Sequence, residues 1–142
     1  MCHLVYFSTT SGEDFSKMLS EHFQICPTDA AETQYLEMLA HSHRWYLMSR
    51  YGGCSCHFRH DINELGFGPV EDWSPEESDD IASTLAFFDL LRRLLDEGHR
   101  VDVLDVWDGT SNDDVRSIEV ALGQIPRDHF RFLEGVRLSL AP

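Results

Sequence analysis

Alternation of hydrophobic and polar positions, together with short apolar runs, predicts four strands outside the centre of the chain. Residues 2–8 (CHLVYFS) and 101–107 (VDVLDVW) are dense in β-branched and aromatic residues, the side chains that favour strands. Residues 115–122 (VRSIEVAL) and 136–140 (VRLSL) alternate with the period of two that a strand requires. These segments predict the strands of a sheet.

Helical spacing predicts one long helix after the middle of the chain. Ser74 and Glu77 form a capping box, Pro75 suits the first helical position, and Gly98 ends the pattern. The helix therefore covers about residues 75–97. Its apolar face comprises Ile81, Leu85, Phe88, Leu91 and Leu95, widened by Phe87, Leu90 and Leu94.

Three shorter helices are predicted from weaker signals. One begins at Ser11, continues through apolar residues at helical spacing, and ends at Pro27. A second covers residues 29–41, and a third lies between Pro126 and Gly135, with proline at its start and glycine at its end.

A glycine doublet predicts a β-hairpin at residues 44–51/54–60. Gly52 and Gly53 separate RWYLMSRY from CSCHFRH, and a two-residue Gly-Gly loop is typical of a tight hairpin turn. The register that this loop sets places Cys54 and Cys56 on the same face as Leu47, Trp45 and Phe58. We therefore expect the two cysteines on the apolar side of the hairpin.

Together these elements predict an α+β fold. Strands and helices mix without a strict β-α-β alternation, so we expect a single, mostly antiparallel sheet of about five to six strands with helices packed on it. The length of 142 residues and the absence of a linker or repeat predict one domain over residues 1–142.

The charge distribution narrows the choice of partners. The formal net charge is −14, and residues 61–119 hold 17 acidic residues against four arginines. Such a surface repels phosphate backbones, so nucleic acid and anionic membranes are excluded as partners, whereas a basic protein is a candidate partner. The start of the chain lacks the basic region of a signal peptide, and no apolar run is long enough to span a bilayer, so we expect a cytoplasmic protein.

The segment RYGGCSCHFRH, residues 50–60, carries the candidate chemistry. Its cysteines could pack as small hydrophobic side chains in the core. Alternatively they could bind zinc, with the metal ligands drawn from Cys2, His3, Cys54, Cys56 and His60 if the first strand lies beside this segment. A third interpretation is a reactive thiol at Cys54 with His60 or His3 as its base.

Other polar residues give no defined site. Asp102 and Asp105 lie on opposite sides of the strand at 101–107, so they do not form a carboxylate pair. His41 and His43 are expected to be solvated. The sequence contains no nucleotide-binding glycine loop and no Gly-x-Ser-x-Gly motif.

Two hypotheses on function follow. The first is a non-catalytic binding module that presents its acidic half to a protein partner. The alternative is a metal or thiol site centred on Cys54 and Cys56, with zinc as the possible cofactor. The first is preferred at this point because it requires no unverified geometry.

Overall fold

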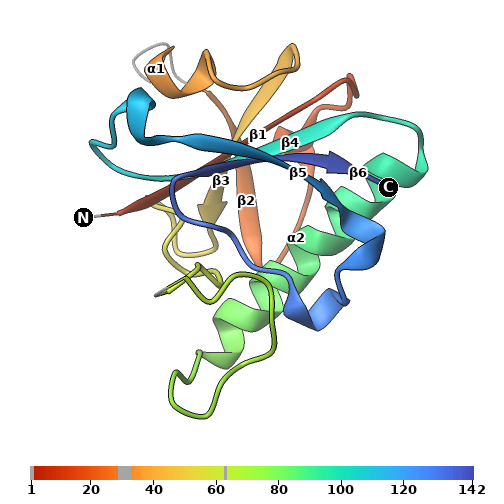
Figure 1. Cartoon of the computed structure of the whole chain (residues 1–142). Coiled ribbons are helices and arrows are strands. Elements are labelled where there is room, and N and C mark those ends of the chain that lie inside the picture. Colours follow the sequence, from red (N-terminus) through yellow and green to blue (C-terminus); the bar gives the residue numbers. More distant parts are fainter. Residues whose placement is uncertain (1, 29–32, 63) are drawn as a thin grey trace.

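One six-stranded mixed sheet organises the part of the chain that the computed structural model describes, residues 2–28, 33–62 and 64–142 (Figure 1). The strand order is β2-β3-β1-β4-β6-β5, and every neighbouring pair is antiparallel except β5 with β6. The α+β class and the mostly antiparallel sheet are confirmed. The strands are β1 His3–Thr9, β2 Phe23–Pro27, β3 His43–Ser49, β4 Val101–Trp107, β5 Arg116–Ala121 and β6 Val136–Ala141.

Helix α2, Ser78–Asp96, crosses one face of the sheet, and the single-turn helix α1, Thr33–Leu36, lies on the opposite side (Figure 1). The remaining helical turns are of the 3-10 type. They are η1 Phe15–Lys17, η3 Asn112–Asp114, η4 Leu122–Gln124 and η5 Arg127–His129. Throughout the described ranges, no helix is long and apolar enough to cross a membrane.

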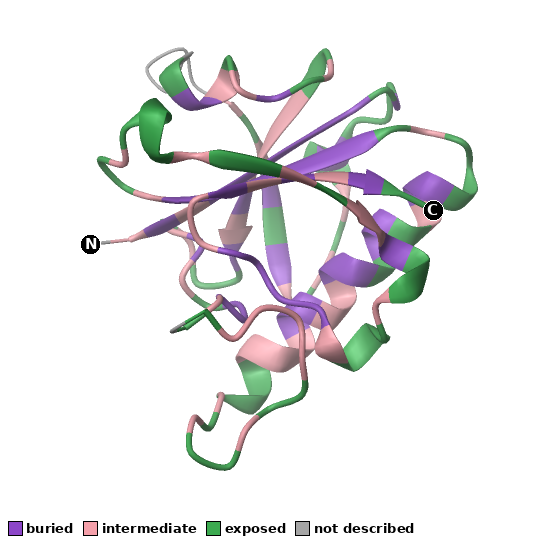
Figure 2. Cartoon of the chain, in the orientation of Figure 1, coloured by how far each residue is buried: buried purple, intermediate pink, exposed green. Residues whose placement is uncertain are grey.

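The core lies on both sides of the two central strands. Side chains alternate along a strand, so Val5 and Phe7 of β1 and Val103 of β4 face α2, whereas Tyr6 and Leu104 pack on the other face. Burial on both faces explains why β1 and β4 are apolar along most of their length (Figure 2).

The long helix ends as predicted but begins later. Gly98 has a φ of +89°, the left-handed conformation that ends a helix. At the other end, Glu77 is the N-cap residue and its side chain makes no capping hydrogen bond. The capping box from Ser74 is therefore wrong. The neighbouring Glu76 forms a bidentate ion pair with the buried Arg59, with both bonds at 3.0 Å.

The predicted helix from Ser11 to Pro27 is wrong. Only η1 is helical there, Leu19 is 99% exposed, and residues 23–27 form strand β2. Phe23 and Ile25 are buried while Gln24 between them is exposed. This period of two outweighs the helical spacing, because the strand can pair along β3.

The other two short helices are reduced to single turns. Of the helix predicted at 29–41, α1 is the only helical part described, and residues 29–32 lie outside the described residues. Within 126–135, η5 gives way to a buried extended segment at 130–133. There the N–H of Phe132 donates to the carbonyl of Arg59 at 2.8 Å, which holds this segment beside residues 59–61.

The chain reverses at the predicted place, but the reversal is a four-residue loop over residues 50–53 and not the predicted two-residue Gly-Gly turn, and the second strand is absent from residues 54–60. Gly52 and Gly53 have φ angles of +84° and +81°, and the N–H of Ser49 donates to the carbonyl of Cys54 at 2.9 Å. Beyond Cys54 no described residue up to 60 pairs with β3. The reason is that β3 is an interior strand, already bonded to β1 on one side and to β2 on the other. The predicted cross-strand register of residues 54–60 is therefore wrong.

The turn supports a first prediction, on stability. Gly53→Ala should lower the free energy of unfolding by about 1 kcal/mol, because a side chain at a positive φ is strained even where there is space for it. Gly12→Ala is the matched control, since its Cβ would also meet open space and its φ is ordinary. Urea unfolding should show little change for Gly12→Ala, and an equal loss in both variants would contradict the assignment of the turn.

Candidate metal centre

Three cysteine sulfurs meet where β1 begins. The Sγ atoms of Cys2, Cys54 and Cys56 all lie within 4.8 Å of one another, and each of the three residues is partly exposed. The fourth cysteine, Cys26, lies on strand β2 and is not part of this group. We call the three residues Cys2, Cys54 and Cys56 the thiol cluster.

Ser55 positions the two cysteines on either side of it. Its side chain is fully buried, its N–H donates to the carbonyl of His3 at 3.0 Å, and its Oγ accepts from the N–H of Val5 at 2.9 Å. The same hydroxyl donates to the carbonyl of Leu47. Ser55 thus bonds to the backbones of β1 and β3 at once, where the pairing of these strands ends.

A backbone hydrogen bond links the thiol cluster to the sheet. The N–H of His3 donates to Cys56 Sγ at 3.3 Å. This donor belongs to a strand, so its position is fixed by the neighbouring pairing of β1 with β4. A fixed N–H group directed at a sulfur favours the thiolate over the thiol.

The thiols differ in acidity. Burial raises the pKa of the Cys54 thiol, but hydrogen bonds from Cys56 and Cys2 outweigh burial, so that this pKa lies below its ordinary value. Burial, followed by the hydrogen bond that it gives to Cys54, raises the pKa of Cys56 to about 12. The first negative charge of the cluster therefore resides on Cys54, with its neighbours as donors.

A second group lies behind the thiol cluster and consists of His3, His60 and Asp105. The Nδ1 atom of His60 is 2.7 Å from one carboxylate oxygen of Asp105, and Nδ1 of His3 is 3.3 Å from the other. The two imidazole rings stack with centroids 3.5 Å apart. All three residues are buried.

His60 is held as an imidazolium. Its other nitrogen, Nε2, is 2.7 Å from the carbonyl of Ser55, so an imidazolium at this position can donate from both of its ring nitrogens. Burial lowers the pKa of His60, but the charge of Asp105 outweighs burial and leaves this pKa above its ordinary value. Burial raises the pKa of Asp105, but His60 outweighs it and leaves that pKa below its ordinary value.

The group of His3, His60 and Asp105 differs chemically from the thiol cluster, because its hydrogen-bonding atoms already have partners. The ring nitrogens of His60 and the oxygens of Asp105 already have partners within the protein, so binding a metal there would break the bond to Ser55 and remove protons from His60. His60 also has no nitrogen left to act as a base for Cys54. We therefore assign His60 a structural role, in which it anchors residues 55–60 to β4.

The surroundings of the thiol cluster are acidic. A cavity of about 240 Å³ extends from His3 and Cys56 to the start of α2 and is lined there by Glu76, Glu77 and Asp80. Burial raises the pKa of the Asp80 carboxyl, an effect that the nearby His57 opposes. Cys56 is the member of the thiol cluster that lines this cavity. Because Glu76 is paired with Arg59, Glu77 and Asp80 are the carboxylates that favour a cation there.

The five residues predicted as metal ligands are thus brought into one region, in two distinct groups. Cys2, Cys54 and Cys56 form the thiol cluster, whereas His3 and His60 contact Asp105. The sequence reasoning did not include Asp105 in the site. Its signal was the alternation within VDVLDVW, which places this carboxylate on the same face as Val101 and Val103 and hence in the core.

Comparison of the chain with protein-family models, with curated proteins and with solved structures finds no match.

The His60–Asp105 pair predicts a pH dependence of stability. A raised pKa means that the folded protein binds the His60 proton more tightly, so this contribution is complete below about pH 6.5 and is lost as pH rises through the folded-state pKa. The free energy of unfolding should therefore fall above neutrality in wild type, and His60→Gln should remove this fall. Urea unfolding at a series of pH values, in the presence of a chelator that keeps the protein metal-free, measures the free energy of unfolding of both proteins.

His43→Gln serves as the control for that series because His43 is exposed and lies at the other end of β3. The His43→Gln protein should show the same fall in the free energy of unfolding with rising pH as wild type. If the free energy of unfolding of His60→Gln depends on pH as it does in wild type, the assignment of a charged His60–Asp105 pair is contradicted. On the acid side, the Asp105 contribution is lost as pH falls through its lowered folded-state pKa.

A further prediction concerns thiol reactivity in the metal-free protein. Cys54 should react with iodoacetamide faster than Cys56 near pH 7.5, because the pKa of Cys54 is lowered and that of Cys56 is about 12. Both residues are partly exposed, so access does not explain the difference. Peptide mass spectrometry at short reaction times gives the order, and equal rates would contradict the assigned acidities.

Proposed function

We propose that this protein is a zinc-binding domain whose ligands are the thiolates of Cys2, Cys54 and Cys56. The observation that carries the proposal is the approach of three sulfurs from two segments more than 50 positions apart in the chain. Thiolates are soft ligands that select zinc or copper(I) over magnesium and calcium. A tetrahedral zinc site with Zn–S bonds of about 2.3 Å requires sulfurs about 3.8 Å apart, which agrees with the separation limit of 4.8 Å.

The site leaves one coordination position open. Among the described residues, no fourth cysteine, histidine or carboxylate joins the group within that limit. Water or an external ligand then completes the tetrahedron, as in zinc sites that exchange a ligand, whereas purely structural sites use four protein ligands. The cavity beside Cys56 gives such a ligand a route to the metal.

The protein provides what a thiolate site needs around its ligands. The N–H of His3 directed at Cys56 neutralises part of the thiolate charge, and Ser55 fixes the spacing of the two chain neighbours. Outer-shell contacts of this kind orient the ligands of metal sites and tune their affinity. We further propose a cytoplasmic location, where a reducing environment keeps the three cysteines of the thiol cluster free for metal binding.

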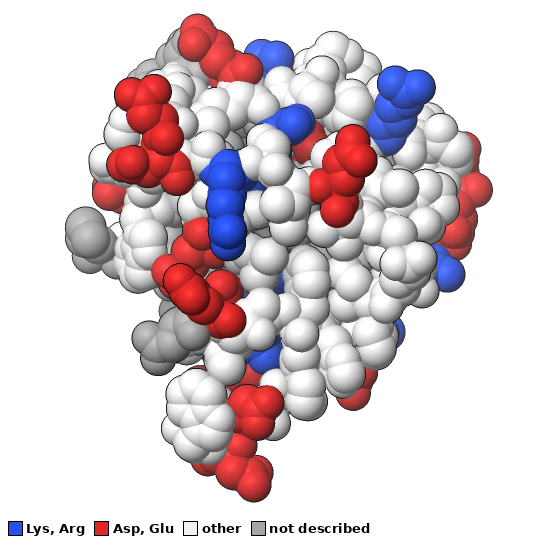
Figure 3. All heavy atoms as spheres, in the orientation of Figure 1, with Lys and Arg blue, Asp and Glu red and all other residues white. Residues whose placement is uncertain are grey.

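The basic protein partner remains a second and weaker proposal. On the face seen in Figure 3 the acidic side chains form several separate groups with basic side chains between them. Ion pairs such as Arg50–Asp79 and Arg127–Asp89 reduce the charge further. Charge that is spread over the surface in this way is typical of a soluble surface and does not define one docking site. The proposed zinc site is therefore preferred to the proposed protein partner.

The test is zinc titration of single-cysteine variants. Cys2→Ala, Cys54→Ala and Cys56→Ala should each weaken zinc binding by more than the roughly 10–100-fold that loss of an outer-shell partner costs. Cys26→Ala should bind one equivalent with wild-type affinity, because Cys26 lies outside the cluster. Calorimetry gives the affinities, and cobalt(II) substitution gives thiolate charge-transfer bands that the three variants should weaken.

Thermal unfolding keeps the proposal testable if a variant folds poorly. Zinc at 100 times its dissociation constant should stabilise wild type and Cys26→Ala by about 2.7 kcal/mol, and Cys54→Ala by much less. The proposal would be refuted if wild type bound less than one equivalent of zinc. It would also be refuted if Cys26→Ala weakened zinc binding as much as the three ligand variants do.

A further inference from the structure

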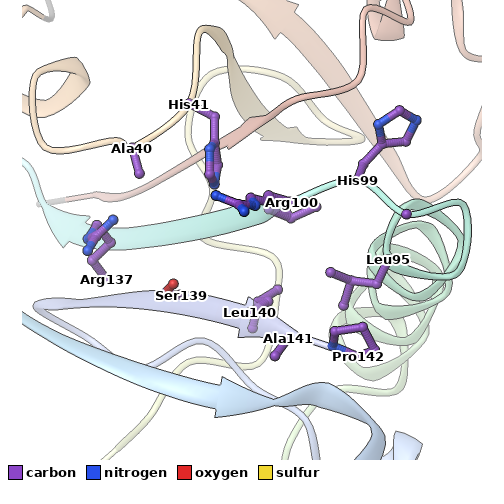
Figure 4. A pocket seen from close by; sticks show the side chains of 12 residues that line it. Ala40, His41, Leu95, His99, Arg100, Arg137, Ser139, Leu140, Ala141 and Pro142 are labelled. Carbon is purple, nitrogen blue, oxygen red and sulfur yellow. The ribbon is translucent and has the colours of Figure 1, made fainter.

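A second cavity, of about 470 Å³, lies apart from the thiol cluster. It is bounded by the end of α2, the start of β4, the end of β6 and the loop at Ala40 and His41 (Figure 4). Its volume is within the range of pockets that hold small organic ligands. Neither the thiol cluster nor His60 lines it.

The polar part of this cavity is basic, although the protein is acidic. Arg100 and Arg137 line it, together with His41, His99 and the hydroxyl of Ser139. Within the described ranges, the guanidinium of the exposed Arg100 has no hydrogen-bond or ion-pair partner. Most other arginines of this chain pair with carboxylates, so a guanidinium without a partner in a cavity is a donor available to a ligand.

Arg137 is held in place. Its Nη1 donates to the fully buried Asp102 at 2.9 Å, and its Nε donates to Ser117 Oγ at 3.1 Å. Asp102 is fixed in turn by Ser8 and by the N–H of Ala40 at 2.8 Å. In the described part of the chain Nη2 has no partner, so a preorganised guanidinium keeps one edge for an external acceptor.

Negative groups near the cavity are already compensated. The carboxylate of Asp102 is paired with Arg137. Glu13, which interacts with His99, is bound by Arg93 at 2.8 Å. The last carbonyls of α2 accept from the N–H groups of residues 97–99, so the helix end does not present bare acceptors to the cavity. Among the described residues that line the cavity, the cation of Arg100 has no carboxylate partner.

The opposite part of the cavity is apolar. Leu95, Leu140 and Pro142 line it, and Figure 4 shows Leu95 and Pro142 at the end away from Arg137. A bare inorganic ion would leave this end unfilled. A ligand with an anionic head and a small apolar body would contact both parts.

We propose that this cavity binds a small organic anion, a phosphate ester or carboxylate, with its head on Arg100 and Arg137 and its apolar body against Leu95 and Leu140. The guanidinium fork matches both head groups. The site is separate from the proposed zinc site, because the cavity lies at the Val101 end of β4, whereas His3 beside the thiol cluster pairs with Trp107 at the other end.

Phenyl phosphate is the probe, titrated into the full-length protein and followed by NMR shifts or calorimetry. Arg100→Gln should weaken binding at least about tenfold, the cost of losing a charge-assisted hydrogen bond. Arg116→Gln is the matched control, since it removes the same charge from an exposed arginine that does not line the cavity. Inorganic phosphate and phenol, which are the two halves of the probe, should each bind more weakly than the whole.

Benzoate in the same assay distinguishes a carboxylate from a phosphate head, and the tighter of the two probes identifies the head group. Failure of both probes to bind at millimolar concentration would overturn the proposal. So would equal weakening by Arg100→Gln and Arg116→Gln, which would indicate a general charge effect. Zinc titration of Arg100→Gln should remain unchanged, so this outcome is separable from the test of the thiol cluster.

Discussion

The candidate site depends on the burial of one hydroxyl group, that of Ser55. A polar side chain with no exposed surface is stable only if its hydrogen bonds are made, and Ser55 makes them to the backbones of β1 and β3. These bonds replace the strand pairing that ends at Val5 and Leu47. Because Ser55 is fixed, Cys54 and Cys56 on either side of it are fixed as well. The thiol cluster is therefore a consequence of how the sheet completes its backbone bonding.

The same irregular segment is secured by two buried charges. Arg59 forms a bidentate pair with Glu76, and His60 forms a single ion pair with Asp105 through Nδ1. Charges withdrawn from water are costly unless each is paired and hydrogen-bonded, which restricts residues 54–60 to one arrangement. The segment has no regular secondary structure, yet its position is set by polar contacts to β1, β4 and the turn before α2. Such a rigid loop on a sheet is suited to hold metal ligands.

Much of the fold could be predicted from the sequence because its central elements carry clear periodic signals. Strands β1, β4 and β6 and the end of α2 at Gly98 follow from composition, alternation and a glycine stop. The hairpin partner did not follow, because a Gly-Gly turn reports local geometry and cannot show that β3 is already paired on both sides. The approach of Cys2 to Cys54 and Cys56 was predicted only for the case in which the first strand lies beside the turn. The sequence does not show which strand lies there. Asp105 was missed because a buried carboxylate is recognised by its partners, and His60 lies 45 positions away.

In the proposed site, three sulfurs and no protein nitrogen surround one metal ion. X-ray absorption at the zinc edge of the loaded wild-type protein measures this directly. We expect three sulfur scatterers at about 2.3 Å and one oxygen at about 2.0–2.2 Å. A shell made of nitrogen and oxygen alone, or one containing imidazole nitrogen from His3 or His60, would contradict it.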